Sequence, residues 1–263
     1  MNKVPIKSAQ EIEWMRESGR LLAQVFTYLN TKIEPGVNTF DINEWVEEYI
    51  FEELQARPAS IGQYDYQYAL NSSINHVVCH GIPDERDILK NSDIVNIDIT
   101  LEKNGYIADS SKMYVMPEAS TQARQLVQAT YDAMWQGIRT VKPGATLGDV
   151  GYAIQKHAET HGYSIVREYC GHGIGKEMHE EPHVLHYGRQ RAGVKLKAGM
   201  TFTIEPMVNQ GTHRTKLKSD GWTVVTKDKK LSAQWEHTVL VTETGFEVLT
   251  LRPDEKRGLK YEP

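Results

Sequence analysis

Five residues of types that bind metal ions are distributed along this chain: Asp98, Asp109, His172, Glu205 and Glu236. Each lies in a short segment that is typical of a strand end or a glycine-rich turn. Burying four carboxylates and an imidazole together is unfavourable unless a cation lies between them. The simplest physical explanation is a shared site for two divalent metal ions, with hydrolysis as its chemistry.

The spacing of the two aspartates predicts a β-hairpin. Residues 94–100 alternate between apolar and polar, which places Asp98 on the polar face of a strand. Asn104-Gly105 favours a two-residue turn, so residue 103 pairs with 106 and Asp109 falls opposite residue 100. The two carboxylates would then share a face as diagonal neighbours, about 7–8 Å apart at their backbones. A solvated polar strand face is the alternative interpretation of this pair.

The other three candidates have weaker individual signals. His172 lies between two glycines, which let the backbone turn sharply and approach a ligand closely, although a lone histidine is more often structural. Alternation in residues 201–206 places Glu205 on the polar face of a strand that Pro206 ends. Alternation in residues 232–240 does the same for Glu236. Each glutamate alone would be an ordinary surface residue, and the joint occurrence is what favours a site.

The donor types limit the metal. Carboxylates and one imidazole, without a required thiolate, suit Mn(II), Fe(II), Co(II) or Zn(II) better than a closed structural zinc site. Two metals that share bridging carboxylates would lower the pKa of a bridging water and polarise a substrate carbonyl. A nearby glutamate could shuttle the proton, and Glu205 is the candidate.

The elements that must position these side chains occur twice. Ile33–Thr39 (IEPGVNT) is echoed by Val141–Leu147 (VKPGATL), with the Pro-Gly pairs 108 residues apart. Downstream, Leu89-Lys90 and Ile97-Asp98 are echoed at an offset of 107 by Leu196-Lys197 and Ile204-Glu205. This period is too long for a solenoid repeat and fits a duplicated α/β unit.

Helical patterns support the duplication. Ser8 and Glu11 have capping-box form before one apolar stripe, and a matching stripe begins at Val127. We expect each helix to run into a Pro-Gly turn that ends it, and a second helix to follow each turn. The sequence therefore predicts an α+β fold, with antiparallel sheet covered by helices and internal pseudo-twofold symmetry. We expect one catalytic domain over residues 1–263, with repeats at approximately 8–115 and 116–250, rather than two domains joined by a linker.

Composition excludes some classes of function. Hydrophobic residues make up 40% and charged residues 25%, as in ordinary globular proteins. The net charge of −5 argues against a general nucleic-acid-binding surface, and no apolar run is long enough to span a membrane. The start of the chain lacks a secretory pattern, and the two cysteines are best explained as reduced thiols. We therefore expect a cytoplasmic protein without sequence-specific nucleic acid binding.

Several motifs resemble those of the pita-bread-fold metallohydrolases, and more narrowly the bacterial type I methionine aminopeptidases. They occur in the family's order and cover residues 10 to 250 approximately. The matching strings are Ser73–Pro83 (SINHVVCHGIP), Val95–Asp98 (VNID), Asp109–Met113 (DSSKM), Gly171–Gly175 (GHGIG), His179–Pro182 (HEEP), Phe202–Met207 (FTIEPM) and Gln234–Thr238 (QWEHT).

The resemblance implies roles for individual residues. All five residues named first would be metal ligands for two divalent ions, with Asp109 and Glu236 bridging them. His80 and His179 would contact the substrate, steadying the scissile peptide and the charge that develops on its carbonyl oxygen. Tyr66 and Trp222 would line a methionine pocket, although Gln63 and Asn71 stand where more apolar lining is expected.

The resemblance also implies an activity. The enzyme would remove the initiator methionine from nascent proteins whose second residue is small and uncharged, by attack of a dimetal-activated water on the first peptide bond. A narrow second pocket would admit Gly, Ala or Ser and reject long side chains. We expect a monomer, with Lys227–Lys230 forming a solvated turn through which a transient ribosome contact is conceivable.

Two alternatives remain open. A prolidase or aminopeptidase P would have the same ligand order, but usually carries an extra N-terminal domain. A pita-bread-fold binding protein that has lost catalysis is the second, because fold alone does not determine function. Such a binding protein would be expected to have lost metal ligands.

Both cysteines, Cys79 and Cys170, are interpreted as small buried side chains. The remaining histidines are interpreted as having no specific partner: His76, His157, His161, His183, His186, His213 and His237.

Overall fold

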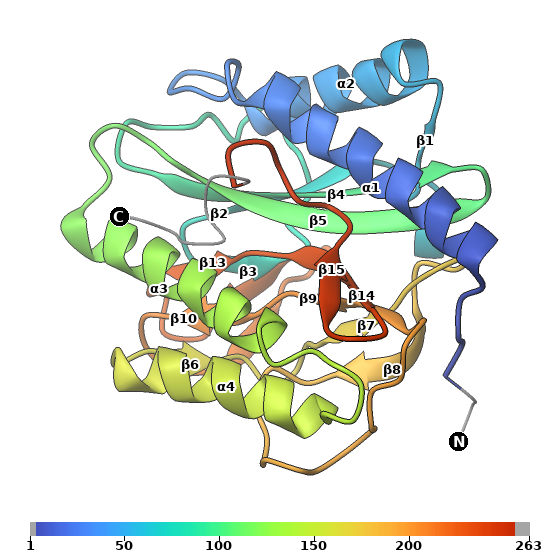
Figure 1. Cartoon of the computed structure of the whole chain (residues 1–263). Helices are drawn as coiled ribbons and strands as arrows, with labels where there is room; N and C mark the ends of the chain where they lie inside the picture. Colours follow the sequence, from blue (N-terminus) through green and yellow to red (C-terminus); the bar gives the residue numbers. More distant parts are fainter. Residues whose placement is uncertain (1–3, 256–263) are drawn as a thin grey trace.

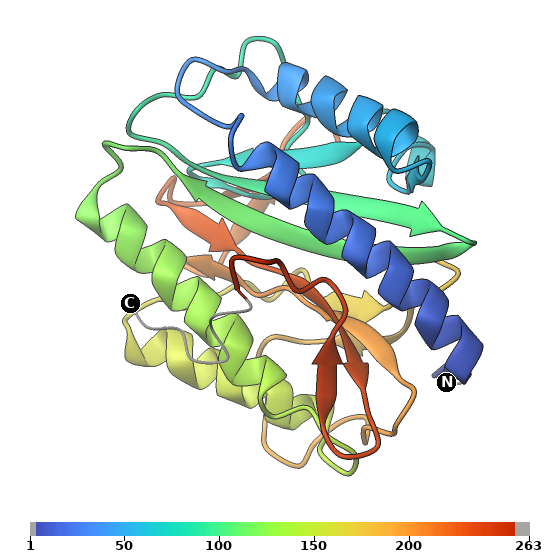
Figure 2. The same ribbon diagram turned by 45° about the horizontal axis from the view of Figure 1, so that its top comes forward.

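Two pairs of helices enclose the strands of this protein (Figures 1 and 2). The structure, a computed structural model, describes residues 4–255; residues 1–3 and 256–263 of the predicted domain lie outside the described part. Helices α1 (Ala9–Leu29) and α2 (Thr39–Glu48) cover one side of the strands. Helices α3 (Thr121–Ile138) and α4 (Leu147–Thr160) cover the other. Two short helical turns, η1 (Tyr49–Glu53) and η2 (Gln63–Asp65), come after α2 in the chain.

The strands pair in antiparallel ladders throughout the described residues, which confirms the predicted α+β class. One sheet contains β1 (Arg57–Pro58), β4 (Ile94–Lys103), β2 (Leu70–Ile74) and β5 (Tyr106–Val115). A second contains β13 (Ser232–Gln234), β10 (Met207–Asn209) and β6 (Ser164–Ile165). A third contains β11 (Thr215–Leu217), β12 (Val224–Thr226) and β3 (Val77–Cys79). The fourth has the order β15 (Phe246–Val248), β14 (His237–Val241), β9 (Thr201–Ile204), β7 (Gly171–Gly173) and β8 (Glu180–Val184).

The helices begin where the sequence predicts but end earlier. The capping box is present: the Glu11 amide donates to Ser8 Oγ, and the Ser8 amide donates to Glu11 Oε2. However, α1 ends at Leu29 and α3 at Ile138, several residues before the Pro-Gly pairs, so the expectation that these pairs end the helices is wrong. The glycines do adopt positive φ, at 97° for Gly36 and 89° for Gly144.

Each Pro-Gly turn instead forms a hydrogen bond that connects its pair of helices to a later segment of the same half of the chain. The Gly36 amide donates to the Leu89 carbonyl at 2.8 Å, and the Gly144 amide donates to the Leu196 carbonyl at 3.0 Å. These are the landmarks whose offsets of 108 and 107 residues suggested a duplication. The same contact therefore recurs in both halves, while the repeat bounds themselves stay a prediction.

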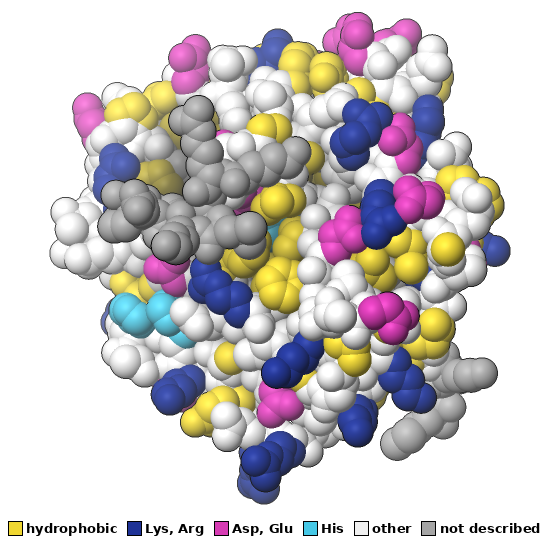
Figure 3. Space-filling model, in the orientation of Figure 1, with side chains coloured by type: hydrophobic (Ala, Val, Ile, Leu, Met, Phe, Trp, Pro, Cys, Tyr) yellow, Lys and Arg dark blue, Asp and Glu magenta, His cyan; other side chains and the backbone are white. Residues whose placement is uncertain are grey.

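Each half has a large hydrophobic cluster of its own. One lies between α1, α2 and the β4–β5 sheet, and includes Phe26, Ile42 and Ile97; the other lies between α3, α4 and the strands of the second half, and includes Met134, Ile154 and Phe202. On the surface, acidic and basic side chains are interspersed over the face that Figure 3 shows. None of the helices within residues 4–255 has the length and apolar character needed to cross a membrane.

The two halves meet along β5 and β14. The Thr238 hydroxyl donates to the Asp109 carbonyl at 2.8 Å and accepts from the Asp109 amide at 3.0 Å. The side chain of Thr238 thus bonds both backbone groups of Asp109, in the place that a neighbouring strand would otherwise take. The candidate metal ligands lie on both sides of this junction, so their geometry depends on how the halves are joined.

Candidate metal centre

The β4–β5 hairpin places the two aspartates as the sequence predicts. Lys103 pairs with Tyr106 across a turn in which Asn104 has φ 56° and Gly105 has φ 76°. Asp109 lies opposite Thr100, which puts it on the same face as Asp98 and diagonal to it. Neither aspartate is at a strand end, contrary to expectation: both lie inside ten-residue strands. A mid-strand position holds the carboxylates more rigidly because both neighbouring peptides are bonded in the ladder.

Glu205 and Glu236 lie where the chain changes from one sheet to another. Residues 232–240 do not form one continuous strand as predicted, because β13 ends at Gln234 and β14 begins at His237. Gln234 pairs with Met207, whereas His237 pairs with Ile204, so the two glutamates occupy facing gaps between these ladders. Pro206 has no N–H group with which to continue the ladder, which explains why the gap occurs there.

His172 lies within the short strand β7 and is tied to Glu205 by one hydroxyl. Thr203 Oγ1 accepts from the His172 amide at 2.9 Å and donates to Glu205 Oε1 at 2.7 Å. The imidazole Nε2 lies 3.5 Å from Glu205 Oε1 and 3.6 Å from Asp109 Oδ2. One ligand atom from each of Asp109, His172 and Glu236 lies within 4.8 Å of the others. The structure therefore brings together residues that are up to 127 positions apart in the printed sequence.

The four carboxyl groups are in an environment that opposes their ionisation. Burial raises the pKa of Asp109 to about 7. Burial, with the nearby charges of Asp109 and Asp98, raises the pKa of Glu205 to about 8. Burial followed by repulsion from Asp109 raises the pKa values of Asp98 and Glu236 well above their ordinary values. Such a cluster is unfavourable as free carboxylates at neutral pH.

The donor set fits divalent cations. Asp109 Oδ1 and Glu236 Oε1 are buried, and neither has a hydrogen-bond partner within the part of the chain that the structure describes. Buried carboxylate oxygens are normally hydrogen-bonded, so two such atoms in one cluster call for another partner. Oxygen and imidazole ligands that converge within 4.8 Å are the arrangement that a divalent ion requires.

A cavity of about 620 Å³ opens above the cluster. Its lining includes Asp98, Asp109, His172 and Glu205 together with all four predicted substrate-contacting residues: Tyr66, His80, His179 and Trp222. The His172 and His179 rings are 4.4 Å apart between centroids. The cavity is thus lined by the predicted substrate residues and by four of the five predicted ligands, whereas Glu236 is buried and is not part of the lining.

Two of the four histidines that line the cavity, His80 and His179, are neutral at pH 7. Burial, assisted by the charges of His172, His80 and His183, lowers the pKa of His179 to about 4. Burial also lowers the pKa of His80. His80 adopts φ 56°, a strained conformation for a residue other than glycine, of the kind that is found at functional sites. A neutral imidazole can donate one hydrogen bond and accept another at pH 7.

The aromatic side chains form one wall of the cavity. Tyr66 and Trp222 lie 4.7 Å apart between ring centroids, and the Tyr66 hydroxyl donates to the Leu70 carbonyl. Met178 is 8% exposed and belongs both to the lining and to a hydrophobic cluster. Gln63 and Asn71 also line the cavity, so its wall mixes apolar and amide groups.

Several contributing residues were missed from the sequence. Tyr64 Oη lies 3.4 Å from His179 Nδ1, and the buried His186 Nε2 accepts from the Glu205 amide at 3.0 Å. The interpretation of His183, His186 and His237 as lacking specific partners is wrong. His183 lies 3.6 Å from Cys170 Sγ in the cavity wall, and His237 is buried and bonded to Thr250 and Glu255. Their contacts are long-range, so no local sequence signal could have found them.

The interpretation of the cysteines holds for one of them. Both thiols are free and both line the cavity, but Cys79 is buried whereas Cys170 is partly exposed. Cys170 Sγ lies 3.6 Å from His183 Nδ1, which also lines the cavity. The partial exposure of Cys170 could not be predicted from the sequence, because the cavity that exposes it is formed only by the tertiary fold.

Comparisons with known proteins agree with the geometry. The sequence model of metallopeptidase family M24 matches residues 13–243. A methionine aminopeptidase of Salmonella typhimurium is 49% identical over 252 residues, which cover 96% of this chain and 96% of that protein. The crystal structure of methionine aminopeptidase from Rickettsia prowazekii is similar at a TM-score of 0.93 and 46% identity, covering 95% of this chain and 100% of that one.

A more distant likeness concerns the fold alone. The crystal structure of the prolidase from Pyrococcus horikoshii has a TM-score of 0.73 and 21% identity, and the match covers 94% of this chain but 63% of that one. The pita-bread fold and the resemblance stated from the motifs are confirmed by these comparisons.

The carboxylate cluster predicts a stability that depends on pH in metal-stripped protein. A carboxyl whose pKa is raised by folding stabilises the folded state at low pH, and this stability is lost as the pH rises through the folded pKa. The buried histidines have lowered pKa values and contribute no further change above their ordinary value of 6.5. Between pH 6.5 and about 8, the free energy of unfolding should therefore fall as Asp109 and Glu205 ionise.

Urea denaturation of metal-stripped protein at several pH values in this window measures the effect. Glu205→Gln is the matched variant, because it keeps the side-chain shape and removes one titrating group, and its slope with pH should be smaller than that of the wild type. Parallel pH curves for the two proteins would show that Glu205 does not titrate there.

Proposed function

The chain belongs to metallopeptidase family M24, and from this premise we propose that it removes the N-terminal methionine of nascent proteins by metal-dependent hydrolysis of the first peptide bond. It is similar to methionine aminopeptidases along nearly its whole length, which identifies it as an aminopeptidase. The observation that carries the proposal is the cluster of buried, partly unpartnered carboxylates at the base of a cavity with two neutral histidines. The finer parts of the proposal concern the number of metal ions, the residues that hold them and the choice of substrate.

Two divalent ions, as Fe(II), Mn(II), Co(II) or Zn(II), would be held by Asp98, Asp109, His172, Glu205 and Glu236. Asp109 and Glu236 would bridge them, in support of which each has a buried oxygen without a hydrogen-bond partner among residues 4–255. His172 and Glu205 are 3.5 Å apart and would bind on the same side. When bound, the metal ions polarise the scissile carbonyl and lower the pKa of water in the site.

Glu205 would carry the proton during the reaction. Its Oε1 is engaged by the Thr203 hydroxyl at 2.7 Å, whereas its Oε2 has only a 3.5 Å contact with the Gln234 amide. Oε2 would take a proton from the attacking water and deliver it to the nitrogen of the leaving amine. The Thr203 and His186 contacts fix the carboxylate and its backbone, which supports a defined path for this proton.

The cavity histidines would orient the substrate. Neutral His80 and His179 rings can each donate an N–H group to the scissile peptide, and a preorganised donor of this kind stabilises negative charge on the carbonyl oxygen. Tyr64 lies at 3.4 Å from His179 and so limits the orientations of its ring. Both histidines would therefore act on the reacting bond without carrying a charge of their own.

The methionine side chain would lie against the aromatic wall. Tyr66 and Trp222 provide flat apolar surfaces next to the cluster, and the amides of Gln63 and Asn71 make this pocket more polar than the resemblance leads one to expect. A preference for a small second residue follows if the second pocket is narrow, since a steric pocket rejects what is too long for it.

The enzyme would act as a cytoplasmic monomer on chains that emerge from the ribosome. In support of a transient ribosome contact, Lys227–Lys230 forms an exposed turn after β12. Reversing the charges of these three lysines should reduce co-sedimentation with ribosomes at low salt. Unchanged pelleting would remove this part of the proposal.

Substrate choice is tested by stripping the protein of metal and reloading it anaerobically with each of the four ions. We expect metal-dependent cleavage of Met-Ala-Ser and no cleavage of Met-Lys-Ser or Ala-Pro-Ser. Cleavage of Ala-Pro-Ser instead would assign the protein to the proline-directed relatives. If metal is bound and none of the three peptides is cleaved, the result would favour a binding protein without catalytic activity.

The proton-carrying role of Glu205 predicts the effect of Glu205→Gln. An amide cannot accept and release the proton, so turnover should fall by about 100-fold or more while the fold is retained. Steady-state hydrolysis of Met-Ala-Ser is measured together with metal content by mass spectrometry. Near-normal turnover with metal retained would rule out this role.

A further inference from the structure

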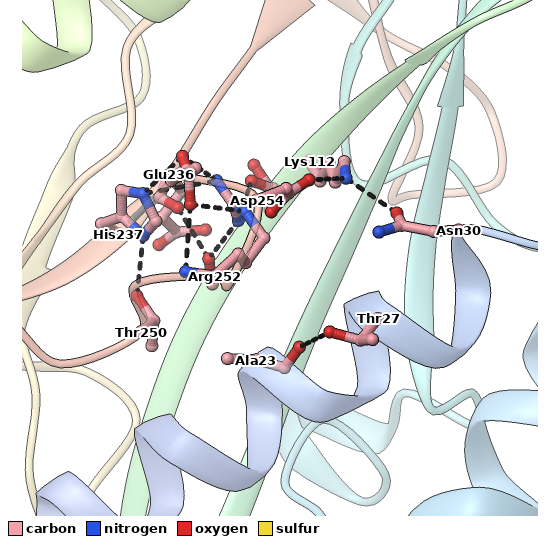
Figure 4. Close-up of polar contacts among 12 residues, drawn as sticks. Ala23, Thr27, Asn30, Lys112, Glu236, His237, Thr250, Arg252 and Asp254 are labelled. Atoms are coloured by element: carbon pink, nitrogen blue, oxygen red, sulfur yellow. Dashed lines mark hydrogen bonds and ion pairs between the residues drawn. The ribbon is translucent and has the colours of Figure 1, made fainter. Parts of the chain in front are cut away.

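A buried arginine, Arg252, lies beside the candidate metal centre and is not among the residues that line the cavity of about 620 Å³. Arg252 is 1% exposed and belongs to the segment that follows β15. Figure 4 shows it beside Glu236 and His237. Burying a guanidinium without compensation is strongly unfavourable, so its partners explain why it is there.

The first partners of Arg252 are on its own segment and on β5. Its Nε lies 2.9 Å from Glu255 Oε2, and its Nη2 donates to Glu255 Oε1 at 3.0 Å. Its Nη1 donates to Ser110 Oγ at 3.0 Å and to the Ser111 carbonyl at 3.2 Å. The guanidinium therefore bonds the residues directly after Asp109.

The same guanidinium contacts the residues on both sides of Glu236. It lies 5.4 Å from the centroid of the Trp235 ring, and its Nη2 lies 3.3 Å from His237 Nε2. Ser110, which accepts from Arg252, in turn donates its hydroxyl to the Glu236 carbonyl at 2.7 Å. Arg252 thus contacts both neighbours of Glu236 directly, and reaches the Glu236 carbonyl through the Ser110 hydroxyl.

A second residue of this segment reaches the backbone of Asp109. Thr250 Oγ1 accepts from the Thr238 amide at 3.1 Å and lies 2.9 Å from His237 Nδ1. Thr238 is the residue whose hydroxyl bonds both the amide and the carbonyl of Asp109. The Thr250–Glu255 segment therefore reaches the backbone of Asp109 through Thr238, and the backbone of Glu236 through Ser110.

A role in stability alone does not explain this arrangement well. A buried ion pair is weak evidence for stability, because its desolvation often cancels its attraction. The gap between β13 and β14 leaves Glu236 outside both ladders, and its backbone bonds β5 instead: its amide donates to the Ser111 carbonyl at 3.3 Å and its carbonyl accepts from the Ser110 hydroxyl at 2.7 Å. Arg252 Nη1 donates to this same Ser111 carbonyl and to Ser110 Oγ, so it fixes the two β5 residues that bond the backbone of Glu236.

We propose that Arg252 is a positioning residue of the metal centre, which sets the backbone of Glu236 through Ser110, Trp235 and His237. This inference rests on the proposed function to the extent that Glu236 and Asp109 hold metal. Outer residues that orient metal ligands typically change metal affinity by about 10–100-fold when they are replaced.

The test compares full-length Arg252→Met with the wild type, both loaded with Co(II). Met fills a similar volume and removes the five donors. We expect Co(II) to be lost to excess chelator about 10–100-fold faster, and its visible absorption bands to shift because the ligand geometry changes. In the peptide assay, kcat should fall while KM stays within about twofold, since the aromatic wall that would bind methionine is not touched.

Lys112→Met is the matched control. Lys112, a cation on β5, anchors the same segment through an ion pair with Asp254 at 2.8 Å, but its hydrogen bonds within residues 4–255 go to Asn30 and Asp254 and not to Ser110 or the residues beside Glu236. This variant should leave the Co(II) spectrum and the rate of metal loss unchanged. An equal effect of both variants would overturn the proposal, because general loosening of the segment would then suffice.

Ser110→Ala keeps the proposal testable if Arg252→Met does not fold. It removes the hydroxyl that links Arg252 to the Glu236 carbonyl, and it should also accelerate metal loss. Unchanged metal loss and an unchanged spectrum in Ser110→Ala would overturn the inference. Because both readouts follow Co(II) and not peptide cleavage, a failure of the proposed activity would be recognised separately, by a wild type that binds metal and cleaves nothing.

Discussion

The mutual repulsion of four buried carboxyl groups is the constraint on which the rest of this structure depends. Burial raises the pKa of each one, neighbouring negative charges raise the pKa values of Asp98, Glu205 and Glu236 further, and two of the carboxyl oxygens have no protein partner within the described part of the chain. Without a cation such a cluster is accommodated by protonation, and a bound cation would instead stabilise the carboxylates in their charged form. The fold around the cluster can be understood as the scaffold that prevents these groups from moving apart.

That scaffold is assembled from both halves of the chain. The first half contributes a ten-residue hairpin whose ladder fixes Asp98 and Asp109, and the second contributes His172, Glu205 and Glu236 from a strand and from gaps between strands. Hydroxyl groups join the pieces: Thr203 links His172 to Glu205, and Thr238 links β14 to Asp109. Ladder hydrogen bonds hold one group of the proposed ligands and side-chain hydrogen bonds hold the other, which explains why buried threonines and serines surround the site.

The parts of this arrangement that follow from local rules could be predicted from the sequence. The Asn104-Gly105 turn and period-two alternation were sufficient to place Asp109 opposite Thr100, and the capping box was sufficient to start α1. The break at Trp235–Glu236 could not be predicted, because alternation continues through it and the change of sheet depends on strands that are far away in the sequence. The same holds for His186, His237 and Arg252, whose partners are brought near only by the tertiary fold. The family motifs identify the ligand types, while the long-range contacts that orient the ligands are visible only in the structure.

We propose that the cluster holds two divalent ions, with Asp109 and Glu236 as the ligands shared between them. The most direct measurement is anomalous X-ray diffraction from crystals of the full-length protein grown with Mn(II). The account predicts two anomalous peaks, roughly 3.5–4 Å apart as in other two-metal sites, each within bonding distance of both Asp109 and Glu236. Peaks at other residues, or an empty cluster in crystals whose dissolved protein cleaves Met-Ala-Ser, would contradict it.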